Sequence, residues 1–248
     1  MQYEFIEPRF PPCSEEAGKS PLCLSPQVQT YSVLNEAECH VLAAVITQAH
    51  ETGQSWASRT RYAAGAQWNV NQQFRSSKNL PPELAGLSLA FEAMHTRVQE
   101  DLSALGLNPR RHSLKLVERQ CLVYQKGDHI GDHADDSALV PAKDSGMPQW
   151  HVVKPERQIA GILWLTSQAS TAERPHEFAG GTFRFNSLVN RESKLPLDIA
   201  PKAGAMVIFP ANPWFRHEVL PVLAGTRIAL ACWWQVLPLA EERIEGVS

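Results

Sequence analysis

The stretch LVYQKGDHIGDHADD, residues 122–136, runs from an apolar segment through a turn to His133-Ala134-Asp135. Its apolar beginning predicts a β-strand, and Gly127 and Gly131 argue against a helix. In an extended chain, residues two apart point to the same face, so an imidazole nitrogen of His133 and a carboxylate oxygen of Asp135 can meet one metal ion. Taken alone, such a tripeptide is more often part of a solvated loop.

The segments around this stretch indicate the fold class. A capping box of Asn35 and Glu38 opens an amphipathic helix, and a second helix is expected over residues 83–107, closed by Gly106. Beyond Arg111, short β-branched and apolar runs alternate with turn residues, at positions 113–124, 157–167, 180–187, 204–211 and 226–237. This order predicts an α+β, mainly β protein, with a double-stranded β-helix (jelly roll) core over about 112–238 that is braced by N-terminal helices.

The composition bounds the domain organisation and the partners. Residues 1–28 contain five prolines and are expected to form an N-terminal arm, followed by a single domain over residues 29–248. The net charge of −3 gives no general attraction to nucleic acid or to a membrane surface, so neither partner is expected. No apolar run approaches the roughly 20 residues that cross a bilayer, and the N-terminus does not resemble a signal peptide. We therefore expect a cytoplasmic location.

The five cysteines, Cys13, Cys23, Cys39, Cys121 and Cys232, show no CxxC spacing. Neither a zinc ribbon nor a disulfide scaffold is indicated, and reduced thiols are expected. Cys121 and Cys232 lie in apolar strand-like runs, so they are expected to be buried as small hydrophobic side chains.

The C-terminal segment HEVLPVLAGTRIALACWW supplies two further residues for the site. A jelly roll can bring His217 back beside the first strand, and two imidazoles with one carboxylate form the facial triad of non-haem iron(II) oxygenases. Arg227 begins an apolar strand, where a guanidinium needs an anion, either a ligand carboxylate or a surface Asp or Glu. Ala229, Ala231 and Trp233 share its face of the strand, and the two small residues leave space for a cosubstrate.

Over residues 70–235 the sequence resembles the prolyl-4-hydroxylase-like branch of the iron(II)/2-oxoglutarate-dependent dioxygenases. The matching segments are VNQQFRSS, LVYQKGDHIGDHADD, RQIAGILWLTS, FAGGTFRF, APKAGAMVIFP and HEVLPVLAGTRIALACWW. The combination is specific because it requires the HxD, the pair Gly180-Gly181, the Pro-Lys-x-Gly turn at residues 201–204 and the HEV-to-Arg spacing in one order.

The resemblance implies that His133, Asp135 and His217 are the iron ligands, that Arg227 anchors 2-oxoglutarate and that Tyr124 lines the cosubstrate pocket. It also implies that Fe(II), 2-oxoglutarate and O2 are required, with ascorbate as an optional stimulant. The expected reaction hydroxylates a C–H bond and decarboxylates 2-oxoglutarate to succinate. No catalytic residue beyond the metal ligands is expected, since the iron and cosubstrate carry the oxidative chemistry.

Two positions depart from the family pattern. Trp164 stands where many relatives carry a tyrosine that helps to grip the cosubstrate, and its indole N–H is a donor only. We expect Trp164 and Trp233 to line the cosubstrate pocket, with an altered contact at Trp164. Ile130 replaces a tyrosine three residues before the HxD histidine, which changes the polarity around the metal. The retained Asp135 argues against the halogenating relatives, which replace this carboxylate.

Four residues are candidates for contact with the substrate: His129, Arg75, Trp150 and Trp214. Arg75 either meets the substrate or braces the sheet, and bracing is favoured. Trp150 lies in a long segment, residues 136–157, whose length is typical of a lid or of an ordinary surface excursion. Asp132 is expected to be solvated.

The expected substrate is amino-acid-like: a free amino acid, a peptide or a small natural product. One alternative is the hydroxylation of a prolyl or other residue in a protein. Two others are a zinc- or manganese-dependent isomerase or hydrolase on the same scaffold and a catalytically silent metal-binding jelly roll. Arg227 argues against both, because neither has a use for a deep anion anchor.

Overall fold

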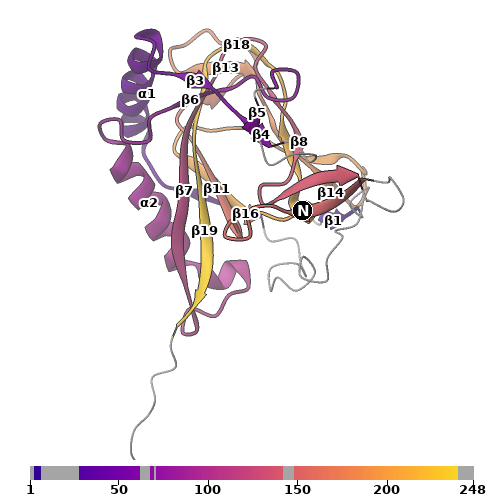
Figure 1. Ribbon diagram of the computed structural model, residues 1–248. Helices are drawn as coiled ribbons and strands as arrows, with labels where there is room; N and C mark the ends of the chain where they lie inside the picture. The colour runs from indigo at the N-terminus through magenta and orange to yellow at the C-terminus, as the bar shows by residue number, and fades with distance from the viewer. Residues whose placement is uncertain (1–2, 7–27, 62–67, 70, 142–147, 240–248) are drawn as a thin grey trace, which may run out of the picture.

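Two antiparallel β-sheets form the centre of the structure, and two helices cover the larger one (Figure 1). The computed structural model describes residues 3–6, 28–61, 68–69, 71–141 and 148–239. In the larger sheet the order is β2 (Gln29–Ser32), β16 (Ala205–Pro210), β11 (Ile159–Trp164), β19 (Arg227–Pro238), β7 (His112–Tyr124), β6 (Lys78–Leu80) and β3 (Trp56–Ala57). In the smaller sheet it is β1 (Tyr3–Phe5), β14 (Phe183–Asn190), β17 (His217–Val219) and β8 (Ile130–His133), with β15 (Pro196–Ile199) beside β14.

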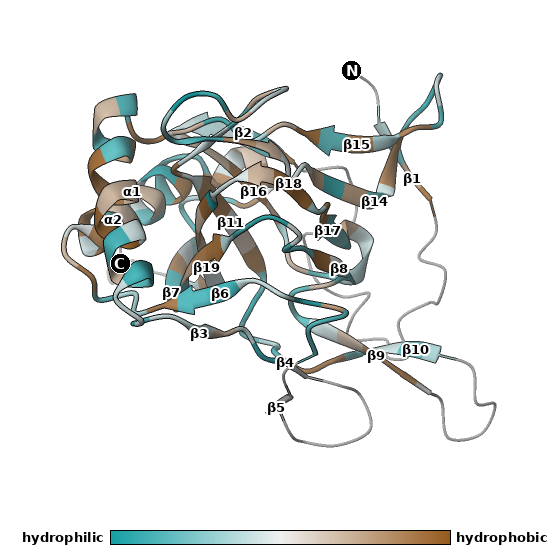
Figure 2. Ribbon diagram, turned by 90° about the horizontal axis from the view of Figure 1, so that it is seen from above, coloured by the Kyte–Doolittle hydropathy of each residue, from teal (hydrophilic) through white to brown (hydrophobic). Residues whose placement is uncertain are grey.

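Three smaller sheets of two or three short strands accompany these two sheets in the described part of the chain. They are β9 (Ser137–Pro141) with β10 (Pro148–Val152), β13 (Glu177–Gly180) between β12 (Ser167–Gln168) and β18 (Val222–Gly225), and β4 (Thr60–Arg61) with β5 (Trp68–Asn69). The β9–β10 hairpin extends from the fold next to β8 (Figure 2). The long segment after the HxD therefore contains a hairpin of its own.

Both expected helices form, and the first has the expected cap. Helix α1 (Glu36–Glu51) begins after Asn35, whose side chain accepts from the backbone N–H of Glu38, while the Glu38 carboxylate accepts from the N–H of Asn35. The second helix is shorter than expected. Gly86 adopts a left-handed φ of 84°, so α2 (Leu87–Glu100) begins after it, and a 3-10 turn, η1 (Leu102–Leu105), carries the chain to the cap Gly106.

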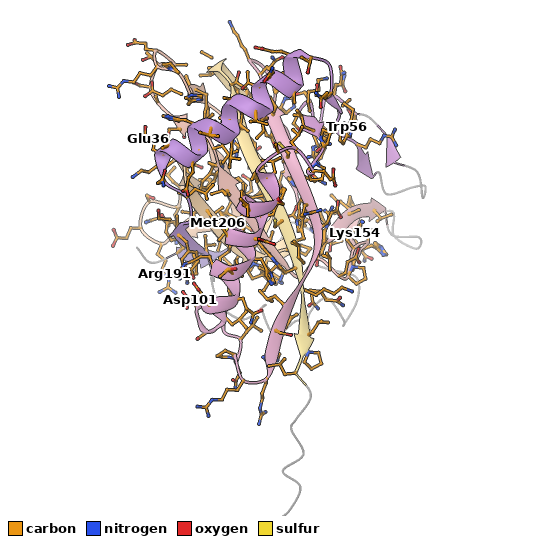
Figure 3. All side chains as sticks on the ribbon, turned by 90° about the vertical axis from the view of Figure 1, so that its left-hand side faces the viewer. Glu36, Trp56, Asp101, Lys154, Arg191 and Met206 are labelled. Atoms are coloured by element: carbon orange, nitrogen blue, oxygen red, sulfur yellow. The ribbon has the colours of Figure 1, made fainter. Side chains whose placement is uncertain are left out.

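Strict alternation along β19 separates two hydrophobic layers. Ile228, Leu230, Cys232 and Trp234 pack in the layer shared with α1 and α2, which lie across this face in Figure 3. Ala229, Ala231 and Trp233 belong to the second layer, between the two sheets. Hydrophobic colour is concentrated on β11 and β19 in the interior (Figure 2). The jelly-roll fold expected from the strand pattern is confirmed, and its first and last core strands begin and end at residues 112 and 238.

Part of the expected N-terminal arm contributes a strand to the smaller sheet. Strand β1 pairs with β14, and the ring of Phe5 meets those of Trp214 and Phe215 at centroid distances of 5.6 and 5.2 Å. Trp214 and Phe215 form the 3-10 turn η2 (Pro213–Phe215) immediately before His217. The N-terminal strand therefore braces the turn that leads into the candidate metal site.

The described cysteines agree with the expectation of buried thiols. Cys39, Cys121 and Cys232 are buried free thiols, whereas Cys13 and Cys23 lie outside the described residues. Within the described parts of the chain, no helix is long and apolar enough to cross a membrane.

Removing the ring of Phe5 tests this bracing. Phe5→Ala is expected to lower the free energy of unfolding by about 1–2 kcal/mol, less than a fully buried phenylalanine costs, because the ring is only partly buried. Urea unfolding measures the change. Leu195→Ala, at a side chain that is 65% exposed, is the control and should stay within about 0.5 kcal/mol of wild type. Equal stabilities of the two variants would show that β1 is dispensable.

Candidate active site

Strand pairing brings the three expected metal ligands together. Strand β17 runs antiparallel to β8, with His217 directly opposite His133, and the two imidazole centroids are 4.4 Å apart. Asp135 follows β8, and its Oδ1 and Oδ2 lie 3.7 Å from His133 Nε2 and 3.9 Å from His217 Nε2. One ligand atom from each residue lies within 4.8 Å of the others.

Backbone carbonyls orient both imidazoles. His133 Nδ1 lies 2.9 Å from the carbonyl oxygen of Gly131, and His217 Nδ1 lies 3.0 Å from that of Phe215. A carbonyl oxygen only accepts, so each Nδ1 carries the proton and donates it, and each Nε2 presents its lone pair. Metal-binding histidines are typically held in this way, with the second nitrogen donating to a fixed acceptor.

The protonation states also suit a divalent metal. Burial, together with the neighbouring His217, lowers the pKa of His133 from 6.5 to about 4. Burial also lowers the pKa of His217. Burial would raise the pKa of Asp135, but the two imidazoles outweigh it and the net shift is downward. The trio is thus two neutral imidazoles and one carboxylate, the forms that bind iron(II). Asp135 Oδ2 is buried and has no hydrogen-bond partner among the described residues, as expected of an oxygen that binds a metal.

Arg227 provides an anion site deep in the same cavity. It is 1% exposed, lies opposite Tyr124 in the β19–β7 ladder, and its guanidinium carbon is 4.7 Å from the centre of the Tyr124 ring. Its Nε donates to the carbonyl oxygen of Gly181 at 3.2 Å, while Nη2 is buried without a partner in the described part of the chain. Such a cation needs an anion, and a carboxylate oxygen fits the free donor.

The glycine pair explains how the backbone comes so close to Arg227. Gly181 has a φ of +60°, and a Cβ there would lie 2.8 Å from the Phe178 ring and 3.1 Å from Cδ of Arg227. A side chain at this position would be strained and would push against the arginine. The Gly180-Gly181 motif thus leaves room for the anion site.

One cavity of about 480 Å³ connects the metal ligands to Arg227. Tyr124, Ala229, Ala231 and Trp233 line it, so the expected face of β19 borders the cosubstrate space. Trp164 is not among the lining residues. It is fully buried, packs edge-on against Phe183 at 6.1 Å, and its indole N–H has no partner within the described residues. Its contact with the cosubstrate remains a prediction.

The structure separates the four candidates for substrate contact into two groups. Arg75 and Trp150 line the cavity. His129 is not among the lining residues, and its ring nitrogens lie within 3.5 Å of Ser76 and of the carbonyl oxygens of Gln73 and Gly127. Trp214 also lies outside the lining and packs against Phe5. The roles of His129 and Trp214 in binding stay predictions.

Several polar residues of the cavity were not singled out from the sequence. Arg157 donates from Nε to Glu118 at 3.1 Å and stacks over the Trp233 ring at 4.0 Å. Asp132, expected to be solvated, instead forms a 2.7 Å ion pair with Arg216 at the cavity wall. Alternation along β7 could have identified Gln120, since it lies four residues from Tyr124 on the same face. The ion pairs Arg157–Glu118 and Asp132–Arg216 join distant segments, so no local pattern in the sequence indicates them.

Comparisons with known proteins agree with this geometry. Residues 119–235 match the model of the 2OG-Fe(II) oxygenase superfamily. No curated protein sequence matches the chain significantly. A prolyl-4-hydroxylase from Pseudomonas putida is 20% identical, with a TM-score of 0.55, over 85% of this chain and 94% of that one.

Two other solved structures have the same fold. A prolyl hydroxylase from Trichoplax adhaerens, in complex with a hypoxia inducible factor oxygen degradation domain peptide fragment, is 16% identical, with a TM-score of 0.56, over 85% of this chain and 84% of that one. A viral collagen prolyl hydroxylase from Paramecium Bursaria Chlorella virus-1, in complex with 2OG, is 17% identical, with a TM-score of 0.50, over 84% and 95%. These likenesses confirm the expected fold.

The buried imidazoles predict how the stability of the metal-free protein depends on pH. His133 takes up a proton near pH 6.5 when unfolded but only near pH 4 when folded. Between these values His133 binds more protons in the unfolded state, so its contribution to the free energy of unfolding should fall as the pH is lowered from about 6.5 to about 4. Asp136, whose pKa burial raises to about 7, contributes in the opposite sense over the same range. Urea unfolding of wild type and of His133→Gln isolates the contribution of His133, because the stability of the variant should fall less, or rise more, as the pH is lowered. Identical pH dependences would contradict the assignment.

Proposed function

This chain belongs to the 2OG-Fe(II) oxygenase superfamily, and we propose that it hydroxylates a C–H bond of an amino-acid-like substrate. The substrate is a free amino acid, a peptide or a small natural product, and 2-oxoglutarate is decarboxylated to succinate in the same turnover. The enzyme is a dioxygenase that uses Fe(II), 2-oxoglutarate and O2. The observation that carries the proposal is a single cavity that joins a His-Asp-His trio to a buried arginine with a free donor.

Each part of the cavity has a distinct task. His133, Asp135 and His217 would hold the iron on one flank, which leaves positions for the cosubstrate and O2. Arg227 would bind the distal carboxylate of 2-oxoglutarate, and Tyr124 would pack against it. When bound, iron and 2-oxoglutarate supply the oxidising power that replaces a substrate hydrogen with a hydroxyl group. The apolar side chains of Ile162, Val219 and Ala229 exclude water from this space.

The alternative functions have less support from the site. A zinc- or manganese-dependent isomerase or hydrolase, or a silent binding module, would have no need for the unpaired Nη2 of Arg227. Hydroxylation of a prolyl or other residue in a protein is the second candidate, because the Trichoplax relative was solved with a peptide fragment of its protein partner. A cytoplasmic location and the lack of nucleic-acid or membrane partners remain part of the proposal.

Anaerobic spectroscopy tests metal and cosubstrate binding together. Adding Fe(II) and 2-oxoglutarate under nitrogen should produce a weak visible metal-to-ligand charge-transfer band. His133→Ala removes a ligand, so the band should disappear. Absence of the band in wild type, or its persistence in the variant, would contradict the assignment. Release of succinate on admission of O2 then reports turnover.

Substitution of the anchor tests the cosubstrate pocket separately. Arg227→Gln removes a charge-assisted hydrogen bond worth roughly 1.5–3 kcal/mol, so 2-oxoglutarate should bind roughly 10- to 150-fold more weakly. Titration of the band with 2-oxoglutarate measures this affinity. Arg174→Gln is the matched control, because its parent side chain is 83% exposed and pairs only with Glu177. An unchanged affinity in Arg227→Gln would place the cosubstrate elsewhere.

A further inference from the structure

The cavity wall carries more positive than negative charge. Among the described residues, six cationic side chains and two carboxylates, those of Asp132 and Asp135, line it. The six cations are Arg59, Arg75, Lys154, Arg157, Arg216 and Arg227. An excess of buried cations is costly unless an anion meets them. The identity of the unpaired cation therefore indicates where an anionic ligand binds.

Three of these six cations already have carboxylate partners. Arg157 and Lys154 pair with Glu118, and Arg216 pairs with Asp132. Arg227 is assigned to the cosubstrate, and Arg59 is exposed to solvent. Arg75 is partly buried, and no carboxylate of the described residues lies within 4.0 Å of its guanidinium nitrogens. Among the described residues that line the cavity, Arg75 is thus a partly buried cation without a carboxylate in contact, and Asp135 and Glu118 act on it only from a greater distance.

Neutral groups hold the guanidinium of Arg75 in place. Its Nε donates to Ser77 Oγ at 3.0 Å, and its Nη2 donates to Gln120 Oε1 at 3.3 Å. These two bonds use two of the five N–H donors of an arginine. They also fix the plane of the guanidinium, so a carboxylate that reaches it meets a preorganised group.

The backbone places Arg75 beside the metal ligands. Its segment pairs with the edge of β8 that β17 leaves free, through an isolated bridge between Arg75 and Ile130 and a 2.7 Å hydrogen bond from Gly131 N–H to Phe74 O. A Cβ at Gly131 would lie 2.9 Å from the Phe74 ring, so the glycine permits this close approach. Arg75 is thus attached to the strand that carries His133.

The cosubstrate does not supply the missing anion. Iron(II) and Arg227 together carry three positive charges, and Asp135 with the dianion 2-oxoglutarate carries three negative charges. This set is neutral by itself, which leaves the charge of Arg75 for another ligand. Trp150, on β10, offers a second unmet donor, because its buried indole N–H has no partner in the described part of the chain and its side chain lines the same cavity.

We propose that the substrate carries a free carboxylate that Arg75 binds, and that Trp150 donates to another acceptor of the same molecule. The inference rests on the proposed function and narrows its substrate class. A free amino acid or the C-terminal residue of a peptide has such a carboxylate, whereas a residue inside a protein chain presents only amide groups at its backbone. Arg75 then determines specificity by its charge.

Paired probes test the preference for a carboxylate. The protein loaded with Fe(II) and 2-oxoglutarate is titrated under nitrogen with acetate, N-acetylglycine and 3-phenylpropanoate, and with the three corresponding amides, by calorimetry. At least one acid should bind about tenfold or more tightly than its amide, because an arginine–carboxylate pair is charge-assisted. If no acid binds more tightly than its amide, the proposal is overturned.

Variants distinguish recognition from bracing of the sheet. In Arg75→Gln the acid-to-amide affinity ratio should fall to about one, whereas Arg75→Lys keeps the charge and should retain part of the ratio. The ratio is measured within one protein sample, so a partly unfolded variant does not bias it. Arg174→Gln should keep the wild-type ratio. A wild-type ratio in Arg75→Gln, even with lowered thermal stability, would assign Arg75 to bracing alone.

Two further readouts separate the parts of the proposal. Trp150→Phe keeps an aromatic ring and removes the N–H, so N-acetylglycine and its amide, which carry a second acceptor, should both bind roughly 2- to 10-fold more weakly, whereas acetate should bind as in wild type. Unchanged binding would remove Trp150 from the recognition site. The anaerobic charge-transfer band in wild type reports the metal and cosubstrate independently. A normal band without acid preference would overturn only this inference, whereas a missing band would overturn the proposed function.

Discussion

The pairing of β17 with β8 is the constraint on which the site depends. It places His217 opposite His133, although a large part of the jelly roll separates them along the chain. His217 is 3% exposed and lies among aromatic rings, with Phe183 at 4.8 Å and Phe209 at 4.9 Å between centroids. Burial there is tolerable because Phe215 O accepts from Nδ1, and Nε2 is left for a metal. The same contacts therefore close the sheet and orient the ligand.

Much of this arrangement follows from the local sequence. The capping box predicts where α1 begins, the apolar runs predict the main core strands, and alternation along β19 predicts that Arg227 and Trp233 share a face. The HxD and the later histidine predict a metal site once a jelly roll is expected, because that fold can bring the two distant strands together. Apart from this pairing, the signals are local periods and motifs that depend on nearby residues.

Other features depend on contacts between distant segments and leave no such signal. The late start of α2 results from the left-handed Gly86, which a periodic pattern does not reveal. The resemblance places Trp164 beside the cosubstrate, and the structure adds that its buried ring packs edge-on against Phe183, a partner that strand alternation does not reveal. Likewise, the hydrogen bond between Arg75 and Gln120 joins residues that only the folded sheet brings together. Tertiary packing decides side-chain partners after the strands have been specified.

Strand β8 lies between the candidate metal site and Arg75, the proposed site for the substrate carboxylate, because its two edges have different neighbours. Strand β17, on one edge, carries the candidate metal ligand His217, and residues 74–76, on the other edge, carry Arg75. Both edges depend on the same short strand, which itself carries His133. Arg227 Nη2 and the indole N–H of Trp150 are buried donors without partners among the described residues. Each such donor costs roughly 1–3 kcal/mol, a large share of the 5–15 kcal/mol that stabilises a typical domain. Ligands that satisfy these donors must therefore stabilise the fold as they bind.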